Sequence, residues 1–338
     1  MSLERALVKA WYEKSIWLYT LLPITWIFTS ASWVRRLYLQ SRYQGQSYAA
    51  PVVVVGNISV GGNGKTPFII SLTLALQQRG VSVGVVSRGF GGKSDEYPLQ
   101  VSAKSNPSQS GDEALLIARS CNCPVVVDPD RNAAVKSILA KHRVDLVLSD
   151  DGLQHYSMHR DLEIAVVDVD RGFGSGYQLP VGPMRESIGR LNEVDFVILN
   201  GQAKLDKQVL HSVNLHRTKM VARGLRKFGS TELVNDTALV GSRTVNVVAA
   251  IANPQRVADT LSLMGFNPIL VALDDHQVIS AGHLVFENSY PVIITAKDAV
   301  KYTDRVPDNL WVLEVEMLLE ADLVEKICHG VKLSVTTD

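Results

Sequence analysis

The sequence feature that most constrains this chain is the stretch of residues 51–67, PVVVVGNISVGGNGKTP. Its four consecutive valines predict a strand buried on both faces of a parallel sheet, and an apolar run with helical spacing follows over residues 68–76. Between them, glycines allow backbone N–H groups to turn toward an anion, and the helix N-terminus adds its dipole. A strand, a glycine loop, a Lys-Thr pair and a helix are typical of a phosphate-binding loop. We therefore expect Lys65 to reach nucleotide phosphates and the Thr66 hydroxyl to ligate Mg²⁺.

The loop departs from the standard pattern in one respect, because Ser59 stands where the first glycine is usual. The alternative interpretation is an ordinary turn between a strand and a helix, but such a turn would not need the lysine. We expect the whole loop to line the nucleotide site, through Ser59, Val60, Gly61, Gly62, Asn63 and Gly64 in addition to Lys65 and Thr66.

The charge balance and the cysteines limit the classes of partner and compartment. The 338 residues carry 34 basic and 34 acidic side chains, so nothing in the overall charge favours a nucleic-acid partner. Three cysteines make no disulfide framework, which indicates a reducing, cytoplasmic compartment. We expect a monomer that binds no nucleic acid.

An uncharged run near the N-terminus, residues 16–34, holds three tryptophans and is followed at once by Arg35 and Arg36. Three interpretations compete: a helix buried in the core, a marginal membrane span, and a helix lying in the membrane interface with aromatic and basic anchors. We favour membrane attachment, mainly through an interfacial or partly inserted helix.

The rest of the chain alternates apolar runs with helical patterns. This alternation predicts an α/β fold in which a parallel sheet has helices on both faces. Residues 93–110 are polar and aperiodic and are expected to form a long loop. The strands expected in this first part are residues 81–86, 124–127, 145–148, 162–167 and 194–199.

The strand pattern weakens over residues 204–245 and then resumes, which predicts a second, smaller α/β domain. We divide the chain into a membrane-associated helix at 1–36, a P-loop domain at 37–212 and a smaller α/β domain at 213–338, whose last strand and helix could pack back on the first. The expected strands of the smaller domain are residues 244–250, 267–273, 292–295 and 310–315.

Polar residues gather where the predicted strands end, which is where parallel sheets place their sites. The acids Asp150 and Asp151 follow the strand 145–148, and an acid in this place holds magnesium in P-loop enzymes. Asp112 and Glu113 open a helix, where two acids could also merely satisfy the helix dipole. The other candidates near strand ends are Arg88, Arg131, Gln154, His155 and, in the second domain, His276.

Taken together, these segments closely resemble the tetraacyldisaccharide 4′-kinase family, the lipid A kinases of Gram-negative bacteria. The resemblance extends over nearly the whole chain. It is carried, in the family's order, by GNISVGGNGKTP, VVSRGFGG, GDEALLIAR, DPDRNAAV, LVLSDDGLQHYSMHRDLEIAVVD, LPVGPMRE, ANPQR, DDHQ and TAKDAVK.

The resemblance implies an activity: transfer of the γ-phosphoryl group of ATP, with Mg²⁺, to the 4′-hydroxyl of a tetraacylated glucosamine disaccharide 1-phosphate. It implies docking on the cytoplasmic face of the inner membrane through the N-terminal segment. It also implies that Asp150 and Asp151 are the metal-binding pair, that Asp112 is the general base, and that His276 pairs with Asp112 across a cleft. Lys65, Thr66, Arg88, Glu113, Arg131, Gln154 and His155 match other positions of the family's active site.

The chain departs from the family at Asn63, where threonine is usual, at Gln277, where a second histidine is usual, and at residues 250–254, which lack the usual glycines. The last two departures bear on substrate contacts and not on the reaction class. The main alternative is a P-loop NTPase switch protein for metal delivery or cargo partitioning, which would release phosphate instead of transferring it. A third class is a membrane scaffold that binds nucleotide without catalysis.

Overall fold

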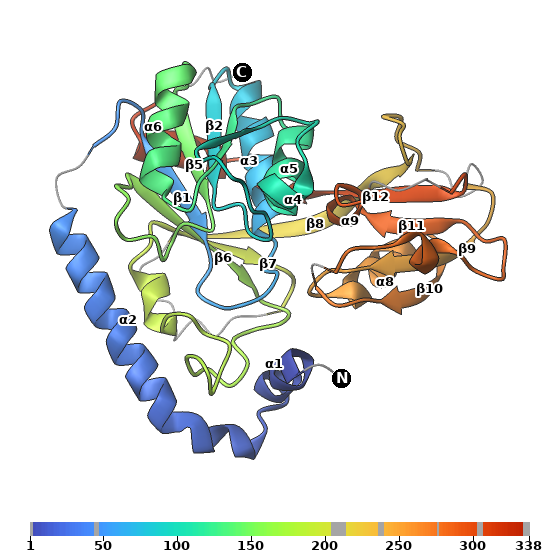
Figure 1. Ribbon diagram of the computed structural model, residues 1–338, viewed down its shortest axis with the longest axis horizontal. Helices are drawn as coiled ribbons and strands as arrows, with labels where there is room; N and C mark the ends of the chain where they lie inside the picture. Colours follow the sequence, from blue (N-terminus) through green and yellow to red (C-terminus); the bar gives the residue numbers. More distant parts are fainter. Residues whose placement is uncertain are drawn as a thin grey trace.

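The computed structural model describes residues 3–43, 47–203, 214–235, 240–275, 277–302 and 307–333, and side chains from residue 6 onward. Within these ranges the strands form one sheet of twelve, in the order β10-β9-β11-β12-β8-β7-β6-β1-β5-β2-β4-β3. The α/β class is confirmed, and the sheet joins two halves of the molecule (Figure 1).

The P-loop half is built on parallel strands. β1 (Val52–Gly56) lies between β5 (Leu146–Asp150) and β6 (Leu162–Asp168). β2 (Val83–Ser87), β4 (Val125–Val127) and β7 (Phe196–Asn200) extend the sheet in parallel on either side. The strands expected here are confirmed, with ends shifted by one or two residues.

The expectation of a long loop over residues 93–110 was wrong. The segment holds β3 (Leu99–Val101), which pairs antiparallel with β4, and the short helix α4 (Pro107–Ser110). A strand of three residues is too short to show a periodicity, and it is recognised only through its partner.

The four valines of β1 are buried against helices on both faces of the sheet. Val53 and Val55 pack with α3 (Lys65–Gln78), α5 (Asp112–Ser120) and α10 (Leu323–Gly330) on one face. Val52 and Val54 pack with α6 (Arg131–Lys141) on the other. All four are fully buried, as a central strand of a parallel sheet requires.

The second half has its own parallel strands and core. β9 (Thr244–Ala249) lies between β10 (Asn267–Ala272) and β11 (Val292–Thr295), and β11 pairs with β12 (Leu310–Leu318). Among its described residues, this half also contains α8 (Pro254–Leu263) and α9 (Ala296–Ala299).

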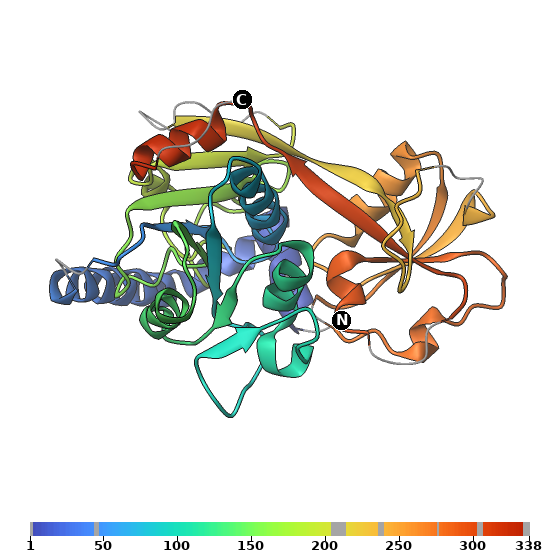
Figure 2. The same cartoon turned by 90° about the horizontal axis from the view of Figure 1, so that it is seen from above.

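One long strand joins the halves. The first residues of β8 (Asn214–Lys227) run parallel to β7, and the remainder pairs antiparallel with β12. Figure 2 shows β8 and β12 as a twisted ribbon that runs from one half into the other. The expectation of a weaker strand pattern after residue 204 was therefore wrong for residues 214–227, which form the strand β8. Burial along β8 is irregular, so its sequence lacks a clean alternation.

The N-terminal segment lies along the P-loop half as α1 (Leu3–Glu13), a 3₁₀ turn (Ile16–Leu21) and α2 (Leu22–Arg42) (Figure 1). Thr25 is the one buried residue of α2, and Trp26 and Trp33 are 64% and 61% exposed. The core-helix interpretation does not fit such a surface helix. Among the described helices none combines the length and apolar character needed to cross a bilayer, so the marginal span is not supported either.

Candidate active site

The phosphate loop begins where β1 ends and is closed by polar side chains. Ser59 accepts a hydrogen bond from Asn63 Nδ2 at 3.0 Å, and Asn200 Nδ2 donates to the Asn63 carbonyl at 3.2 Å. Gly64 precedes α3 with φ +86°, and a Cβ there would lie 2.5 Å from Met317 Cε. The left-handed backbone favours glycine at this position, so the loop can present its N–H groups at the start of α3.

The acids Asp150 and Asp151, at and just after the end of β5, reach this loop because β5 pairs directly with β1. Val55 is opposite Asp150, and Lys65 Nζ lies 3.4 Å from Asp151 Oδ1. Asp151 itself has φ +48°, an uncommon backbone for a residue other than glycine. The P-loop lysine and the acid pair therefore lie together at the end of β1 and β5.

The environments of the two acids drive their pKa values apart. Burial alone would raise the pKa of Asp151, but the charges of Lys65 and Arg185 bring it down to about 2. Burial, followed by the negative charges of Glu113 and Asp151, raises the pKa of Asp150 to about 7. Adjacent titratable groups whose pKa values are shifted in opposite directions are typical of functional sites.

A hard cation fits the oxygen atoms at this place. Asp150 Oδ1 is buried and has no hydrogen-bond partner among the described residues, while Ser87 Oγ lies 3.3 Å from the other oxygen. Thr66 is buried at the first turn of α3. Carboxylate and hydroxyl oxygens are the ligands that Mg²⁺ prefers.

Arg185 completes the site but was not among the residues predicted from the sequence. Its Nη1 lies 3.0 Å from Asp151 Oδ2 and 3.3 Å from Gln154 Oε1. Gln154 Nε2 in turn donates to the Asn57 carbonyl and to Glu186 Oε2, both at 3.0 Å. The available signal was the segment LPVGPMRE, which contains both Arg185 and Glu186.

Two further candidates lie beside the acids and not on the phosphate loop. Arg131 is buried and donates to the backbone carbonyl of Asp150 at 3.2 Å, so it holds the backbone of the acid pair in place. His155 contacts Ser157 at 3.2 Å and Asp130 at 3.9 Å. Burial and the charge of Arg131 lower the pKa of His155 to about 4, so its imidazole is neutral at pH 7.

The start of α5 meets the second half of the molecule. Asp112 is buried, with Oδ2 4.0 Å from Lys301 Nζ, and Glu113 Oε1 lies 2.9 Å from Lys297 Nζ. The structure thus brings the GDEALLIAR and TAKDAVK segments together. His276 lies outside the described residues, so its expected pairing with Asp112 stays a prediction.

Arg88 and Arg256 mark the rim of the site. Arg88 is exposed directly after β2. Arg256, in the first turn of α8, was not selected from the sequence and lies 3.0 Å from Asp168 Oδ2 at the end of β6. The ANPQR segment of the second half therefore reaches the strand ends of the first.

Comparisons with known proteins agree with this arrangement. The family model described as tetraacyldisaccharide-1-P 4′-kinase matches residues 17–332. A tetraacyldisaccharide 4′-kinase of Psychromonas ingrahamii is 40% identical over 328 residues, covering 95% of this chain and 98% of the relative. One of Aeromonas hydrophila is 41% identical over 329 residues, covering 96% and 95%.

A solved structure has the same fold. The crystal structure of LpxK from Aquifex aeolicus in complex with ATP superposes with a TM-score of 0.76 at 24% identity, covering 94% of this chain and all of that one.

Proposed function

This chain belongs to the tetraacyldisaccharide-1-P 4′-kinase family, and we propose that it transfers the γ-phosphoryl group of ATP to the 4′-hydroxyl of a tetraacylated disaccharide 1-phosphate. The product is the bisphosphorylated precursor of lipid A. The observation that carries the proposal beyond family membership is the meeting of Lys65, at 3.4 Å, with an acid pair whose two pKa values diverge.

In the proposed reaction the 4′-oxygen forms a bond to the γ-phosphorus, and the bond from that phosphorus to the β,γ-bridging oxygen breaks. ADP leaves with the electron pair. The loop from Ser59 to Gly64 holds the phosphates through backbone N–H groups, and Lys65 neutralises their charge. Arg88 is exposed directly after β2, at the carboxyl edge of the sheet, where it can meet the anionic substrate.

The hydroxyl proton needs an acceptor, and we assign it to the Asp112 carboxylate. Asp112 is buried at the start of α5, next to Glu113, whose charge also acts on Asp150. A positioned base of this kind contributes ~10²–10⁴-fold to a rate. His276 is proposed to orient Asp112 from the second half.

Thr66, Asp150 and Asp151 would hold Mg²⁺. When bound, the ion would offset negative charge on the phosphates. Arg131 supports this pair by fixing the Asp150 carbonyl, and Gln154 and His155 extend the same wall of the site.

The acceptor is a lipid, and the exposed tryptophans of α2 suit a membrane surface. We propose that α2 lies in the interface of the cytoplasmic face of the inner membrane, with Trp26 and Trp33 among the acyl chains. The enzyme would act there as a monomer with a kinase domain at 37–212 and a smaller domain at 213–338.

The test is a transfer assay with the purified full chain, γ-labelled ATP and the acceptor lipid in mixed micelles, resolved by thin-layer chromatography. We expect label in the lipid, and none when the acceptor already carries a 4′-phosphate. Label released only as free phosphate would support the switch protein instead, and no turnover of ATP would support the scaffold.

A further inference from the structure

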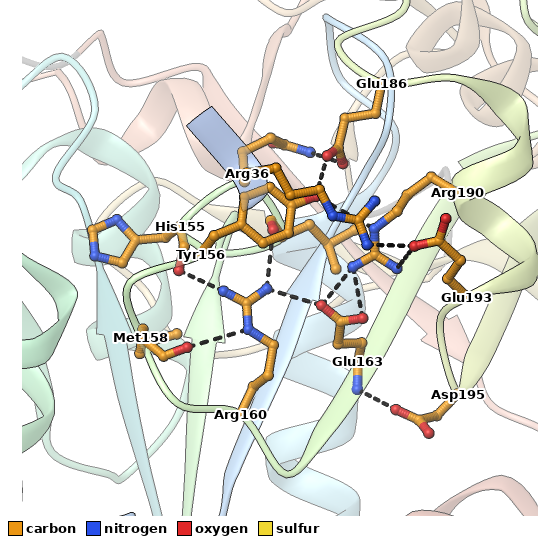
Figure 3. A network of polar contacts seen from close by, with 12 residues as sticks. Arg36, His155, Tyr156, Met158, Arg160, Glu163, Glu186, Arg190, Glu193 and Asp195 are labelled. Atoms are coloured by element: carbon orange, nitrogen blue, oxygen red, sulfur yellow. Dashed lines mark hydrogen bonds and ion pairs between the residues drawn. The ribbon is translucent and has the colours of Figure 1, made fainter. Parts of the chain in front are cut away.

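Tyr156 is a buried tyrosine five residues after Asp151 in the sequence, and it is held by two arginines. The guanidinium carbon of Arg36, from α2, lies 5.0 Å from the centre of its ring, and that of Arg160 lies 5.2 Å away. Figure 3 shows the ring at the centre of a network of polar side chains. Such contacts fix the ring, because a cation is attracted to the face of an aromatic system.

The hydroxyl of Tyr156 is fixed as well. It donates to Glu186 Oε1 and accepts from Arg190 Nε at 3.4 Å. Arg190 is itself buried and bonds both carboxylate oxygens of Glu163 at 2.6 Å. Burial and the neighbouring Glu186 raise the pKa of Tyr156 to about 12, so the hydroxyl remains a proton donor throughout the working pH range.

From Glu186 an unbroken series of contacts leads to the phosphate loop. Glu186 Oε2 accepts from Gln154 at 3.0 Å, and Gln154 Oε1 accepts from Arg185 at 3.3 Å. Arg185 holds Asp151 at 3.0 Å, and Asp151 lies 3.4 Å from Lys65. Each member is bound on both sides, so the position of one restricts the next.

The other end of the series is α2. Arg36 forms an ion pair with Glu193 while it packs on Tyr156, and Arg35 Nη1 donates to the Gln154 carbonyl at 3.3 Å. The helix with the exposed tryptophans is thereby attached to the segment that follows the acid pair.

We propose that Tyr156 is a positioning residue for phosphoryl transfer, which holds Glu186 so that Gln154 and Arg185 keep Asp151 in place, and that Arg36 ties its position to α2. The inference rests on the proposed role of Asp151. The physical reason is competition for one guanidinium. Glu186 is the chain neighbour of Arg185, and without the tyrosine hydroxyl its carboxylate can turn toward Arg185 and displace Asp151.

The central experiment compares Tyr156→Phe with Tyr38→Phe, which removes a hydroxyl that accepts a hydrogen bond from the exposed Arg42 on α2. The measured quantities are kcat, KM for ATP and for the acceptor, and Tm. We expect Tyr156→Phe to lower kcat by on the order of 10-fold to 100-fold, since small misplacements at a reacting centre cost this much. KM for ATP should stay within about twofold, and Tyr38→Phe should match the wild type.

A second step separates positioning from a general loss of stability. In the background of Arg185→Lys, where the clamp on Asp151 is already weakened, Tyr156→Phe should lower kcat by less than about twofold, because residues acting through one another are non-additive. Because the competing group is the Glu186 carboxylate, adding Glu186→Gln to Tyr156→Phe should recover most of the lost kcat, which it would not do for a Tyr156 variant that merely folds poorly. Equal losses in both backgrounds, or an unchanged kcat, would overturn the proposal.

The α2 arm uses Arg36→Ala against Arg42→Ala on the same helix. Both remove one positive charge, so both should weaken binding to anionic vesicles alike, while only Arg36→Ala should lower kcat. Equal kcat values would separate α2 from Tyr156 and remove Arg36 from the proposal. Wild-type transfer to lipid in the same assay tests the proposed function independently.

Discussion

At the scale of single residues, the site places one lysine and one arginine on the same carboxylate. Lys65 comes from the first turn of α3 and Arg185 from a loop far along the chain, and both contact Asp151. Asp150, next to it, is buried, and among the residues that the structure describes no cation contacts its side-chain oxygens in the same way. The two acids therefore differ in charge near neutral pH, although they are adjacent in the sequence.

The first prediction concerns Lys65. Lys65→Ala should lower kcat by on the order of 10²–10³-fold, because a preorganised cation at developing phosphoryl charge contributes several kcal/mol. Lys65→Arg, which keeps the charge, should lose less. The measurement is label transfer from ATP, with Tm recorded to confirm folding. Near-normal turnover of the alanine variant would remove the nucleotide site from this loop.

The second prediction concerns pH. Because the pKa of Asp150 is about 7 in the folded protein and 3.8 as its ordinary value, the folded state keeps a proton that the unfolded chain has lost between these values. Its contribution to stability is complete below pH ~4 and is lost as the pH rises through ~7. Asp150→Asn should therefore have a higher Tm than the wild type at pH 8, in the absence of metal and nucleotide, and this difference should shrink toward pH 5.

Asp151→Asn is the matched control, because the pKa of Asp151 is lowered where that of Asp150 is raised. The depressed pKa of Asp151, about 2, stabilises the fold above pH ~4, and this contribution is lost as the pH falls through ~2. Asp151→Asn should thus lower Tm at pH 8. The same Tm change in both variants would contradict the opposite pKa shifts of the two acids.

The third prediction concerns the proposed base. Asp112→Ala should lower kcat by ~10²–10⁴-fold with KM for ATP little changed. If Asp112 only caps α5, the loss would be about 1 kcal/mol of stability and none of the rate. Steady-state kinetics of the double variant with His276→Ala decide whether the two act as a unit: it should be little worse than the poorer single variant, and multiplicative losses would separate them.

At the scale of elements, the N-terminal helices differ in what they bury. Trp11 of α1 is 5% exposed, packs in a cluster with Val181 and donates to the Pro180 carbonyl at 2.8 Å. The tryptophans of α2 point to solvent instead. Removing residues 1–36 would therefore disturb the loop before Arg185 as well as the membrane contact. Point substitutions in α1 and α2 can separate the loss of packing from the loss of membrane binding.

The fourth prediction uses this difference. Trp26→Ser with Trp33→Ser should reduce sedimentation with lipid vesicles and raise KM for the acceptor several-fold, while KM for ATP and Tm stay near the wild type. Trp11→Ser is the matched control and should lower Tm, because it opens a packed cluster. Unchanged vesicle binding of the double variant would remove the interfacial role of α2.

At the scale of the whole molecule, two halves share one sheet and touch again beside the site. β8 and β12 connect them, and ion pairs cross between them from Glu113 to Lys297 and from Asp168 to Arg256. Helix α5 of one half, which begins with Asp112 and Glu113, is thus held by a cation of the other half. A relative movement of the halves would alter the charge that Asp112 and Glu113 experience.

The fifth prediction measures this contact. A double-mutant cycle of Glu113→Gln and Lys297→Met should give a coupling of about 1 kcal/mol in urea unfolding, since both side chains are mostly buried. The exposed pair Asp322–Lys326 on α10 is the control and should give a smaller coupling. Coupling no larger than in the control would mean that the halves are held by the β8–β12 ribbon without help from this ion pair.

The sequence by itself determined what depends on near neighbours. Valines 52–55, the glycine loop and the helix of Lys65 are contiguous, so spacing and residue type suffice to predict the strand, the anion-binding turn and the lysine's direction. The acids of β5 could be predicted as well, because the carboxyl ends of parallel strands share one edge of a sheet.

Only the tertiary structure decided which distant groups meet. Arg185 reaches Asp151 across 34 residues, and Lys297 reaches Glu113 across 184. The strand β8 has an irregular burial pattern and becomes a strand through its partners β7 and β12. Local propensity carries no information on such pairings, because their free energy comes from contacts that form only when the sheet is assembled.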